Sequence, residues 1–86
     1  MKTTYDPEAD AAYIKISQGP IASTEELSDT CVLDRDASGH IVGIELLSVF
    51  GFAGASIALL VDRGLLSRGD SQKILADLRG EVVAAA

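Results

Sequence analysis

The chain of 86 residues lacks tryptophan and has one cysteine, one histidine, two phenylalanines and two tyrosines. One cysteine excludes an internal disulfide, and a single cysteine with a single histidine is too few for a structural zinc site, which takes four ligands. Neither a Gly-x-Ser-x-Gly elbow nor a Gly-rich phosphate loop occurs in the sequence. We therefore favour a protein that is not an enzyme, and we expect no cofactor.

Basic residues are also scarce, and they form no cluster. The first 50 residues contain nine acids and three bases, whereas the remainder contains four of each, so the net charge of -6 belongs to the first part. An acidic surface without a patch of lysine and arginine repels phosphate backbones. Direct binding to nucleic acid is therefore not expected.

One long uncharged run is present, but it does not have the features of a membrane span. No charged residue occurs between Leu46 and Val61, whereas a transmembrane helix needs about 20 predominantly apolar residues. The run also includes two serines and two glycines. No charged and apolar leader opens the chain at Met1 to Tyr5, and Cys31 has no partner cysteine, so we expect a cytoplasmic protein.

The first half alternates short apolar or β-branched segments with turn residues, a pattern that predicts an antiparallel β-meander. Asp6-Pro7 and Gly19-Pro20 mark two of the turns. On the second predicted strand, Ala12, Ile14 and Ile16 share one face and are the better candidates for the core. The expected strands cover residues 2–5, 11–16, 21–28 (an edge strand or a loop), 30–34 and 40–47.

From Phe50 onward, apolar residues recur at a spacing of three and four, which predicts a pair of helices. Gly64 suits the C-terminal cap of the first helix, and Ser67 followed by Asp70 suits the N-terminus of the second. The small residues from Gly51 to Ser56 would let a helix approach the sheet or a second subunit closely.

Together these patterns predict an α+β fold in a single domain, residues 1–86. An antiparallel β-meander of four to five short strands would occupy residues 1–49, and a C-terminal helical hairpin would occupy residues 50–86. A domain of this size buries only about 60 to 65% of its unfolded surface, yet 48% of its residues are apolar. An apolar excess in so short a chain predicts a homo-oligomer.

Residues 34–45 permit two interpretations. Their polar residues follow the spacing of an EF-hand calcium loop, although neither flank has the periodicity of a helix. The matching residues are Asp34, Asp36, Ser38, Gly39 and Glu45. The segment Asp36-Ala37-Ser38-Gly39 also has the composition of a β-turn between two β-branched flanks. We favour the β-hairpin, with a weaker cation site at its mouth as the alternative.

Three segments of the first half resemble one protein family. They are Tyr5-Asp6-Pro7-Glu8-Ala9-Asp10, Ala12-Tyr13-Ile14-Lys15-Ile16 and Val42-Gly43-Ile44-Glu45-Leu46-Leu47, with Asp34, Asp36 and Gly39 before the third. Over about residues 5–47 the chain is similar to the small bacterial family called domain of unknown function 2283. The resemblance implies a compact β-meander, usually finished by a helix, with no established activity. It also implies a link to small toxin-like proteins and so an antitoxin role, although the tail after Leu47 is longer than the family needs.

Six acids crowd the turns and strands of this half. If they converge across the sheet, they could hold a divalent cation or serve as acid and base. The candidate metal ligands are Asp34, Asp36, Glu45, Asp6 and Asp10. These acids also have structural uses, because Asp6 can accept hydrogen bonds from the amides of its own turn and Asp10 from amides at the start of the next strand.

The leading interpretation is a small acidic module for protein-protein interaction that self-associates and pairs, like an antitoxin, with a small protein. The contrast between a charged half and an uncharged, apolar tail motivates it. The candidate partner-binding residues are Phe50, Phe52, Leu60 and Leu78. The alternative is a protein that binds a divalent cation or small ligand through its turn carboxylates. We expect His40 to face solvent and Cys31 to be a buried, inert thiol.

Overall fold

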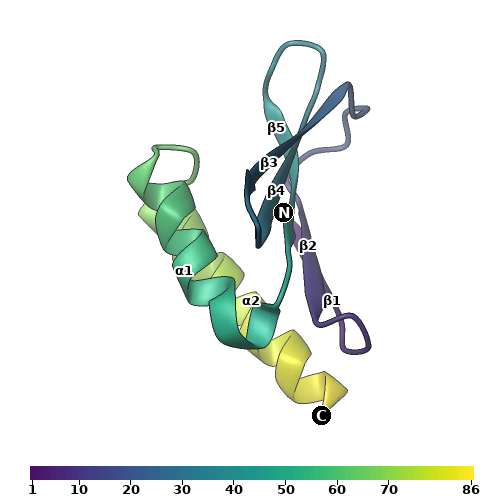
Figure 1. Ribbon diagram of the computed structural model, residues 1–86, viewed down its shortest axis with the longest axis vertical. Coiled ribbons are helices and arrows are strands. Elements are labelled where there is room, and N and C mark those ends of the chain that lie inside the picture. Colours follow the sequence, from purple (N-terminus) through teal and green to yellow (C-terminus); the bar gives the residue numbers. More distant parts are fainter.

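Five strands form one antiparallel sheet, and two helices pack against one face of it in the computed structural model, which describes residues 1–86 (Figure 1). This arrangement confirms the predicted α+β fold. The strands are β1 (Lys2–Asp6), β2 (Ala11–Lys15), β3 (Ser23–Ser28), β4 (Cys31–Arg35) and β5 (Ile41–Leu46), and the helices are α1 (Val49–Asp62) and α2 (Arg68–Ala85).

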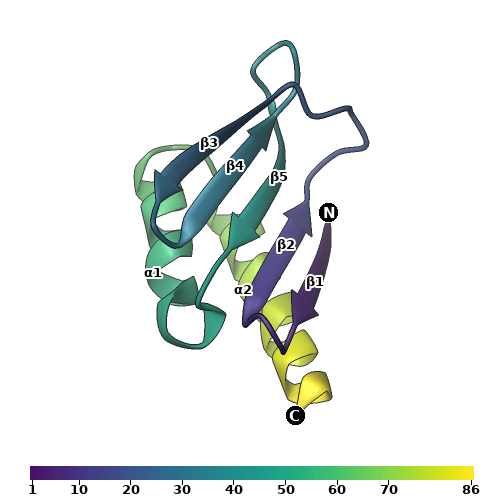
Figure 2. The ribbon, with the colours of Figure 1, turned by 45° about the vertical axis from the view of Figure 1, so that its right-hand side comes forward.

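The strand order is β1-β2-β5-β4-β3, with every neighbouring pair antiparallel. β1 and β2 form a hairpin, and β3, β4 and β5 form a meander that joins it through the β2–β5 pair, as Figure 2 shows. The chain between β2 and β3 therefore runs to the far edge of the sheet, which leaves β1 and β3 as its two edge strands.

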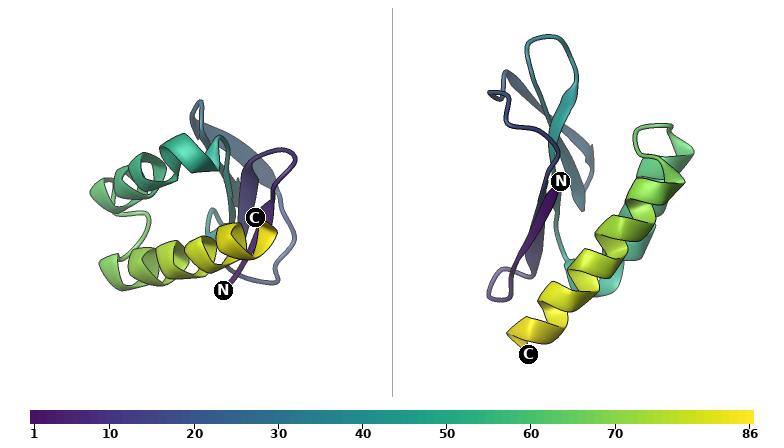
Figure 3. Two further views of the ribbon diagram at one scale, coloured as in Figure 1. Left: turned by 90° about the horizontal axis from the view of Figure 1, so that it is seen from below. Right: turned by 180° about the vertical axis from the view of Figure 1, so that it is seen from behind.

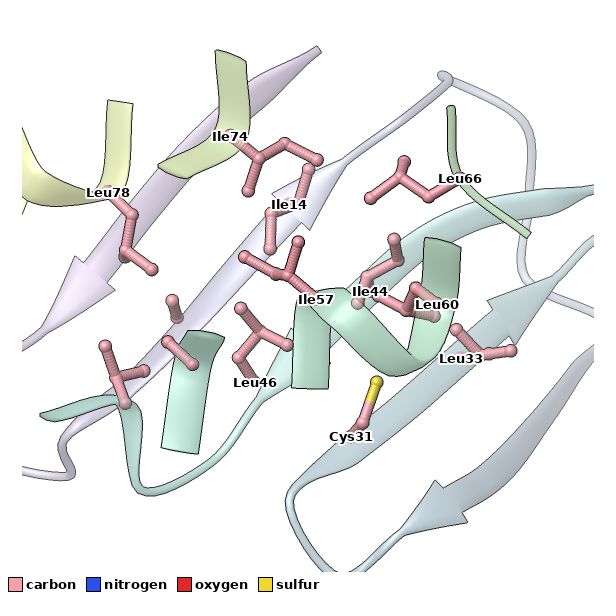
Figure 4. Packing of buried hydrophobic residues seen from close by; sticks show 13 residues of the cluster. Ile14, Cys31, Leu33, Ile44, Leu46, Ile57, Leu60, Leu66, Ile74 and Leu78 are labelled. Atoms are coloured by element: carbon pink, nitrogen blue, oxygen red, sulfur yellow. The ribbon is translucent and has the colours of Figure 1, made fainter. Parts of the chain in front are cut away.

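The core lies between the sheet and the helical hairpin and is almost entirely aliphatic (Figure 4). Alternate residues of β2, β4 and β5 point toward the helices, as the pleat of a strand requires. Ala12 and Ile14 are buried and Ile16 packs against the core, so the predicted core face of the second strand is confirmed. The other buried apolar residues of the cluster are Cys31, Leu33, Ile44, Leu46, Val49, Ala53, Ile57, Leu60, Leu66, Ile74 and Leu78.

The two helices are antiparallel and lie on the same side of the sheet, as Figure 3 shows. Their shared turn contains Gly64 in a left-handed conformation, with φ of 70°, which a glycine adopts at little cost. The Ser67 side chain accepts a hydrogen bond from the Asp70 N–H at 3.0 Å, so the predicted cap of the second helix is confirmed. Neither helix combines the length and apolar composition that crossing a bilayer requires.

The glycines of α1 have a different position from the one expected. A Cβ added at Gly51 or Gly54 would meet no atom within 4 Å, and both residues are exposed. They therefore do not allow a close approach to the sheet, because they point away from it. At these two glycines, the surface of α1 has no side chain and is exposed to solvent.

Candidate functional site

A polar network crosses the face of the sheet that the helices leave uncovered. The Tyr13 hydroxyl of β2 donates to Asp34 Oδ2 of β4 at 2.7 Å, and Thr24 Oγ1 of β3 donates to Asp34 Oδ1 at 2.8 Å. The Asp34 carboxylate thus holds three strands together by side chains alone. In this sheet β5 lies between β2 and β4, so the tyrosine ring has to pass over one residue of β5.

That residue is Gly43, which pairs with both Asp34 and Lys15. A Cβ at position 43 would overlap the Tyr13 hydroxyl and its ring carbon. Only glycine leaves the ring room to lie across the strand, which gives a physical reason for the glycine of the Val42-Gly43-Ile44-Glu45 segment.

The network stabilises the protonated form of Tyr13. Burial, followed by the hydrogen bond to Asp34 and the charges of Asp34 and Glu45, raises the pKa of Tyr13 to about 12. An efficient general acid or base needs a pKa near the working pH. Tyr13 therefore keeps its proton at neutral pH and acts as a hydrogen-bond donor that joins strands, which is a structural role.

Asp10 joins the sheet to the helical layer. Its carboxylate accepts the Phe50 N–H, with 3.2 Å to each oxygen, and its carbonyl accepts the Val49 N–H at 3.0 Å. Tyr5 donates to the same carboxylate at 2.8 Å. This hydrogen bond, with burial and the nearby acids, raises the pKa of Tyr5.

Asp10 is therefore the N-terminal cap of α1, supplied from 40 residues upstream. Ser48, which precedes the helix, makes no side-chain cap. The expectation that Asp10 would bond amides at the start of β2 is wrong, because its carboxylate accepts an N–H of α1 instead. The backbone of Asp10 is left-handed, with φ of 50°. The expectation for Asp6 is confirmed, since its carboxylate accepts the Glu8 N–H at 3.0 Å within its own turn.

The segment 34–45 is a hairpin, and the EF-hand interpretation is excluded by the strands on both of its sides. Asp36 Oδ1 accepts the N–H groups of Ser38 and His40, at 2.9 and 3.0 Å, and Gly39 has a φ of 86°. His40 has a side chain that is 80% exposed, which agrees with a solvent-facing residue.

The structure separates the acids that were candidates for a cation site. Asp6 and Asp10 lie at the β1–β2 turn, Asp34 at the centre of the open face, and Asp36 in the β4–β5 turn. No group of three or more histidine, cysteine, aspartate or glutamate side chains is placed to hold a metal ion. Four of the five candidate carboxylates, all except Glu45, accept hydrogen bonds from the protein.

The lone cysteine belongs to the core. Cys31 is fully buried between β4 and α1, where Figure 4 shows it pointing toward the helix. Burial raises the pKa of its thiol. A buried thiol with a raised pKa is a poor nucleophile, as expected from its apolar neighbours in sequence.

The surface of α1 that faces away from the sheet is apolar and exposed. We call it the α1 outer surface, and it consists of Phe50, Gly51, Phe52, Gly54, Ala55 and Ala58. Phe50 is 83% exposed and Phe52 is 53% exposed. Beside Phe50 lies a groove of about 340 Å³ between the start of α1 and the end of α2, with Leu75, Val82 and Val83 in its wall.

The four predicted partner-binding residues therefore fall into two groups. Phe50 and Phe52 are on the α1 outer surface, whereas Leu60 and Leu78 are 0% and 4% exposed. Both leucines pack between the helices and the sheet, so they are unavailable to a partner. On α1 the spacing of apolar residues could not separate Leu60 from the phenylalanines, because this helix is apolar on both of its sides.

The chain is thus a small α+β protein in which a two-stranded hairpin joins a three-stranded meander. The chain belongs to the family described as protein of unknown function DUF2283, whose family model matches residues 2–49. The match covers the whole sheet and ends at the first residue of α1, so the helical hairpin lies almost entirely beyond it. No curated protein and no solved structure shows significant similarity to the chain.

Proposed function

We propose that the chain is a non-enzymatic interaction module that self-associates through the α1 outer surface. The observation that carries this proposal is the exposure of the only two phenylalanines of the chain. Residues two apart on a helix point in directions about 160° apart, so Phe50 and Phe52 border the small residues of that surface on its two sides. Large contiguous apolar patches on a soluble protein mark sites of association. A helix that is apolar on all sides is normally buried on all sides.

The inward side of α1 already has its partner. Val49, Ala53, Ile57 and Leu60 are buried against the sheet and α2. The outward side has the same apolar character, with no charged residue before Asp62 at the end of the helix. Burying the outward side would therefore remove apolar area from water without stripping any charge of its hydration.

A second copy of this chain is the occupant that we propose for this surface, because the surface carries no charge. Two molecules of net charge -6 repel each other over most of their surfaces. The α1 outer surface is where they can meet without placing like charges together. A contact about a two-fold axis would bury the same patch on both copies, and the phenylalanines would supply roughly 200 to 300 Å² of the approximately 800 Å² per partner that a stable interface needs.

The test is the oligomeric state, measured by light scattering during size-exclusion chromatography. We expect the wild-type protein to elute as a dimer or larger, and Phe52→Ser to shift it toward the monomer. Ile21→Ser is the matched control, because Ile21 is 55% exposed, close to the 53% of Phe52, but lies on the β2–β3 connection. A wild-type monomer at high concentration, or equal effects of the two variants, would contradict the proposal.

A small basic protein is the second candidate partner, in an antitoxin-like role. The excess of nine acids over three bases in the sheet half favours it, since a complementary charge raises association rates and selects partners. Affinity purification at native expression level would identify the partner, and rescue of growth would test the role. Both candidates assume a cytoplasmic protein, in keeping with the unpaired Cys31 thiol.

A further inference from the structure

The two edge strands of the sheet differ in how they are protected. β3 has an irregular register between Glu26 and Ser28 and displays Glu25 and Glu26 to solvent. Bulges and charges of one sign are devices that prevent an edge from pairing with another strand. β1 pairs with β2 over five consecutive residues without a register shift, and it contains no proline.

The sequence of β1 is complementary to itself. Lys2-Thr3-Thr4-Tyr5-Asp6 has a base at one end and an acid at the other, with a threonine at the centre. Antiparallel pairing about Thr4 would place Lys2 opposite Asp6 of the second copy, and Asp6 opposite its Lys2. The same operation on β3 would bring its adjacent glutamates together with those of the second copy, which is unfavourable.

We propose that the free edge of β1 binds β1 of a second copy in antiparallel register, which joins two sheets into one of ten strands. This contact is distinct from the one on α1 and does not depend on it. Backbone hydrogen bonds would supply the pairing, and the two Lys2–Asp6 pairs would set its register.

The side chains of β1 are compatible with this register. Lys2, Thr4 and Asp6 are exposed on the open face of the sheet, whereas Thr3 and Tyr5 are half-buried on the face toward the helices. Pairing about Thr4 matches exposed residues with exposed ones and places Thr3 opposite Tyr5 of the second copy. A shift by one residue would break this match.

The space beside β1 is also open. A hollow of about 430 Å³ separates the start of β1 from α2, with Lys2, Thr3, Asp77, Gly80 and Glu81 in its wall. Thr3 Oγ1 is buried there without a hydrogen-bond partner. α2 therefore packs against β1 on the helix side of the sheet, and the strand makes no backbone pairing on the side away from β2.

The test is amide hydrogen exchange of the full chain at several concentrations, followed by nuclear magnetic resonance. We expect the β1 amides that point away from β2 to become protected as concentration rises, while the β3 edge amides do not. Because the readout is specific to β1, it is independent of the α1 contact, and repeating it with Phe52→Ser separates the two contacts. Outward β1 amides that exchange at one rate at all concentrations would overturn the proposal.

Charge variants test the register. In a Lys2→Glu dimer, Asp6 of each copy would lie opposite the new glutamate of the other copy. We therefore expect the dissociation constant of the β1–β1 dimer to rise at least about tenfold at low salt. Arg63→Glu is the matched control, because it changes the net charge by the same amount and Arg63 is exposed at the end of α1, not on the sheet. Equal loss of protection in the two variants would contradict the proposal.

A mixture of two variants provides the rescue. In an Asp6→Lys dimer, the new lysine would lie opposite Lys2 of the other copy. When a Lys2→Glu chain pairs with an Asp6→Lys chain, each of the two contacts joins an acid to a lysine. We expect the mixture to recover the protection that each variant lacks alone. Asp6 also accepts the Glu8 N–H, so the thermal midpoint of Asp6→Lys is measured alongside. Folded variants whose mixture gives no recovery would overturn the register.

Discussion

The open face of the sheet and the outer surface of α1 are both left uncovered by the rest of the chain, yet they have opposite properties. On the sheet, the Asp34 carboxylate accepts hydrogen bonds from Tyr13 and Thr24, so the exposed polar groups satisfy one another. On α1, Phe50 and Phe52 lie in solvent and no polar group compensates for them. The comparison teaches that one exposed surface can have its polar groups satisfied within the chain, whereas another can leave apolar side chains in water, and only the second would gain from a partner.

The largest expected effect separates the two sides of α1. Leu60→Ala removes a fully buried side chain, and we expect it to lower the free energy of unfolding by about 2 to 5 kcal/mol. Phe50→Ala removes a side chain that is 83% exposed, so the stability of the monomer should change by less than about 0.5 kcal/mol. Urea denaturation at a concentration low enough to keep the protein monomeric would measure both. Similar losses would show that Phe50 belongs to the core.

Asp10 tests how the sheet holds the helical layer. Asp10→Ala removes the cap of α1 and puts an alanine at a φ of 50°, so we expect a loss of about 2 to 3 kcal/mol from these two causes. Asp10→Asn keeps an acceptor oxygen and a residue that tolerates this backbone, and should lose less. Thermal unfolding followed by circular dichroism would rank them. Equal losses would mean that only the charge matters.

Substituting one glycine on each surface compares the open face of the sheet with the α1 outer surface. Gly43→Ala pushes the Tyr13 ring away from Asp34, because the new methyl group overlaps the ring. We expect a loss of about 1 to 3 kcal/mol, the value of a buried hydrogen bond to a charged group. Gly51→Ala has free space around it and should gain up to about 1 kcal/mol from helix propensity. Chemical denaturation gives the sign of each, and a neutral Gly43→Ala would show that Tyr13 moves aside at no cost.

The last expected effect is confined to alkaline pH. In the unfolded chain the pKa of Tyr13 is near 10.0, whereas in the folded chain it is about 12. The folded state therefore retains a proton that the unfolded state loses, so this contribution is complete below pH 10.0 and disappears as the pH rises toward about 12. Tyr13→Phe should flatten the fall in stability over that interval. The titration of tyrosinate absorbance checks the pKa itself, and an unchanged slope would contradict the assignment.

The features that could be predicted from the sequence are those set by neighbouring residues. Asp36 bonds amides two and four positions ahead, and Ser67 caps an amide three positions ahead. Glycines at 39 and 64 adopt left-handed backbones in their own turns. Such interactions depend on a few residues of chain, so composition and spacing are enough to identify them.

Two contacts of the candidate site could not be predicted in this way. Asp10 caps a helix 40 residues later, and Tyr13 bonds an aspartate 21 residues later. Both contacts follow from the strand order, in which β2 lies beside β5. Tyr13 and Gly43 both belong to the segments that resemble the family. Nothing in the sequence says that these two residues are adjacent, so it could not predict the contact.

The sequence by itself determined the class of the fold, the hairpin at 34–45 and the helical hairpin, because local hydrogen bonding and periodicity decide these. Its motifs also indicated the family of the sheet. Only the tertiary structure decided which apolar residues of α1 are buried and which acids are already bonded. Packing brings distant segments together and leaves one side of α1 without a neighbour, and periodicity cannot reveal this when both sides of a helix are apolar. The same packing gave Asp34 and Asp10 partners within the chain.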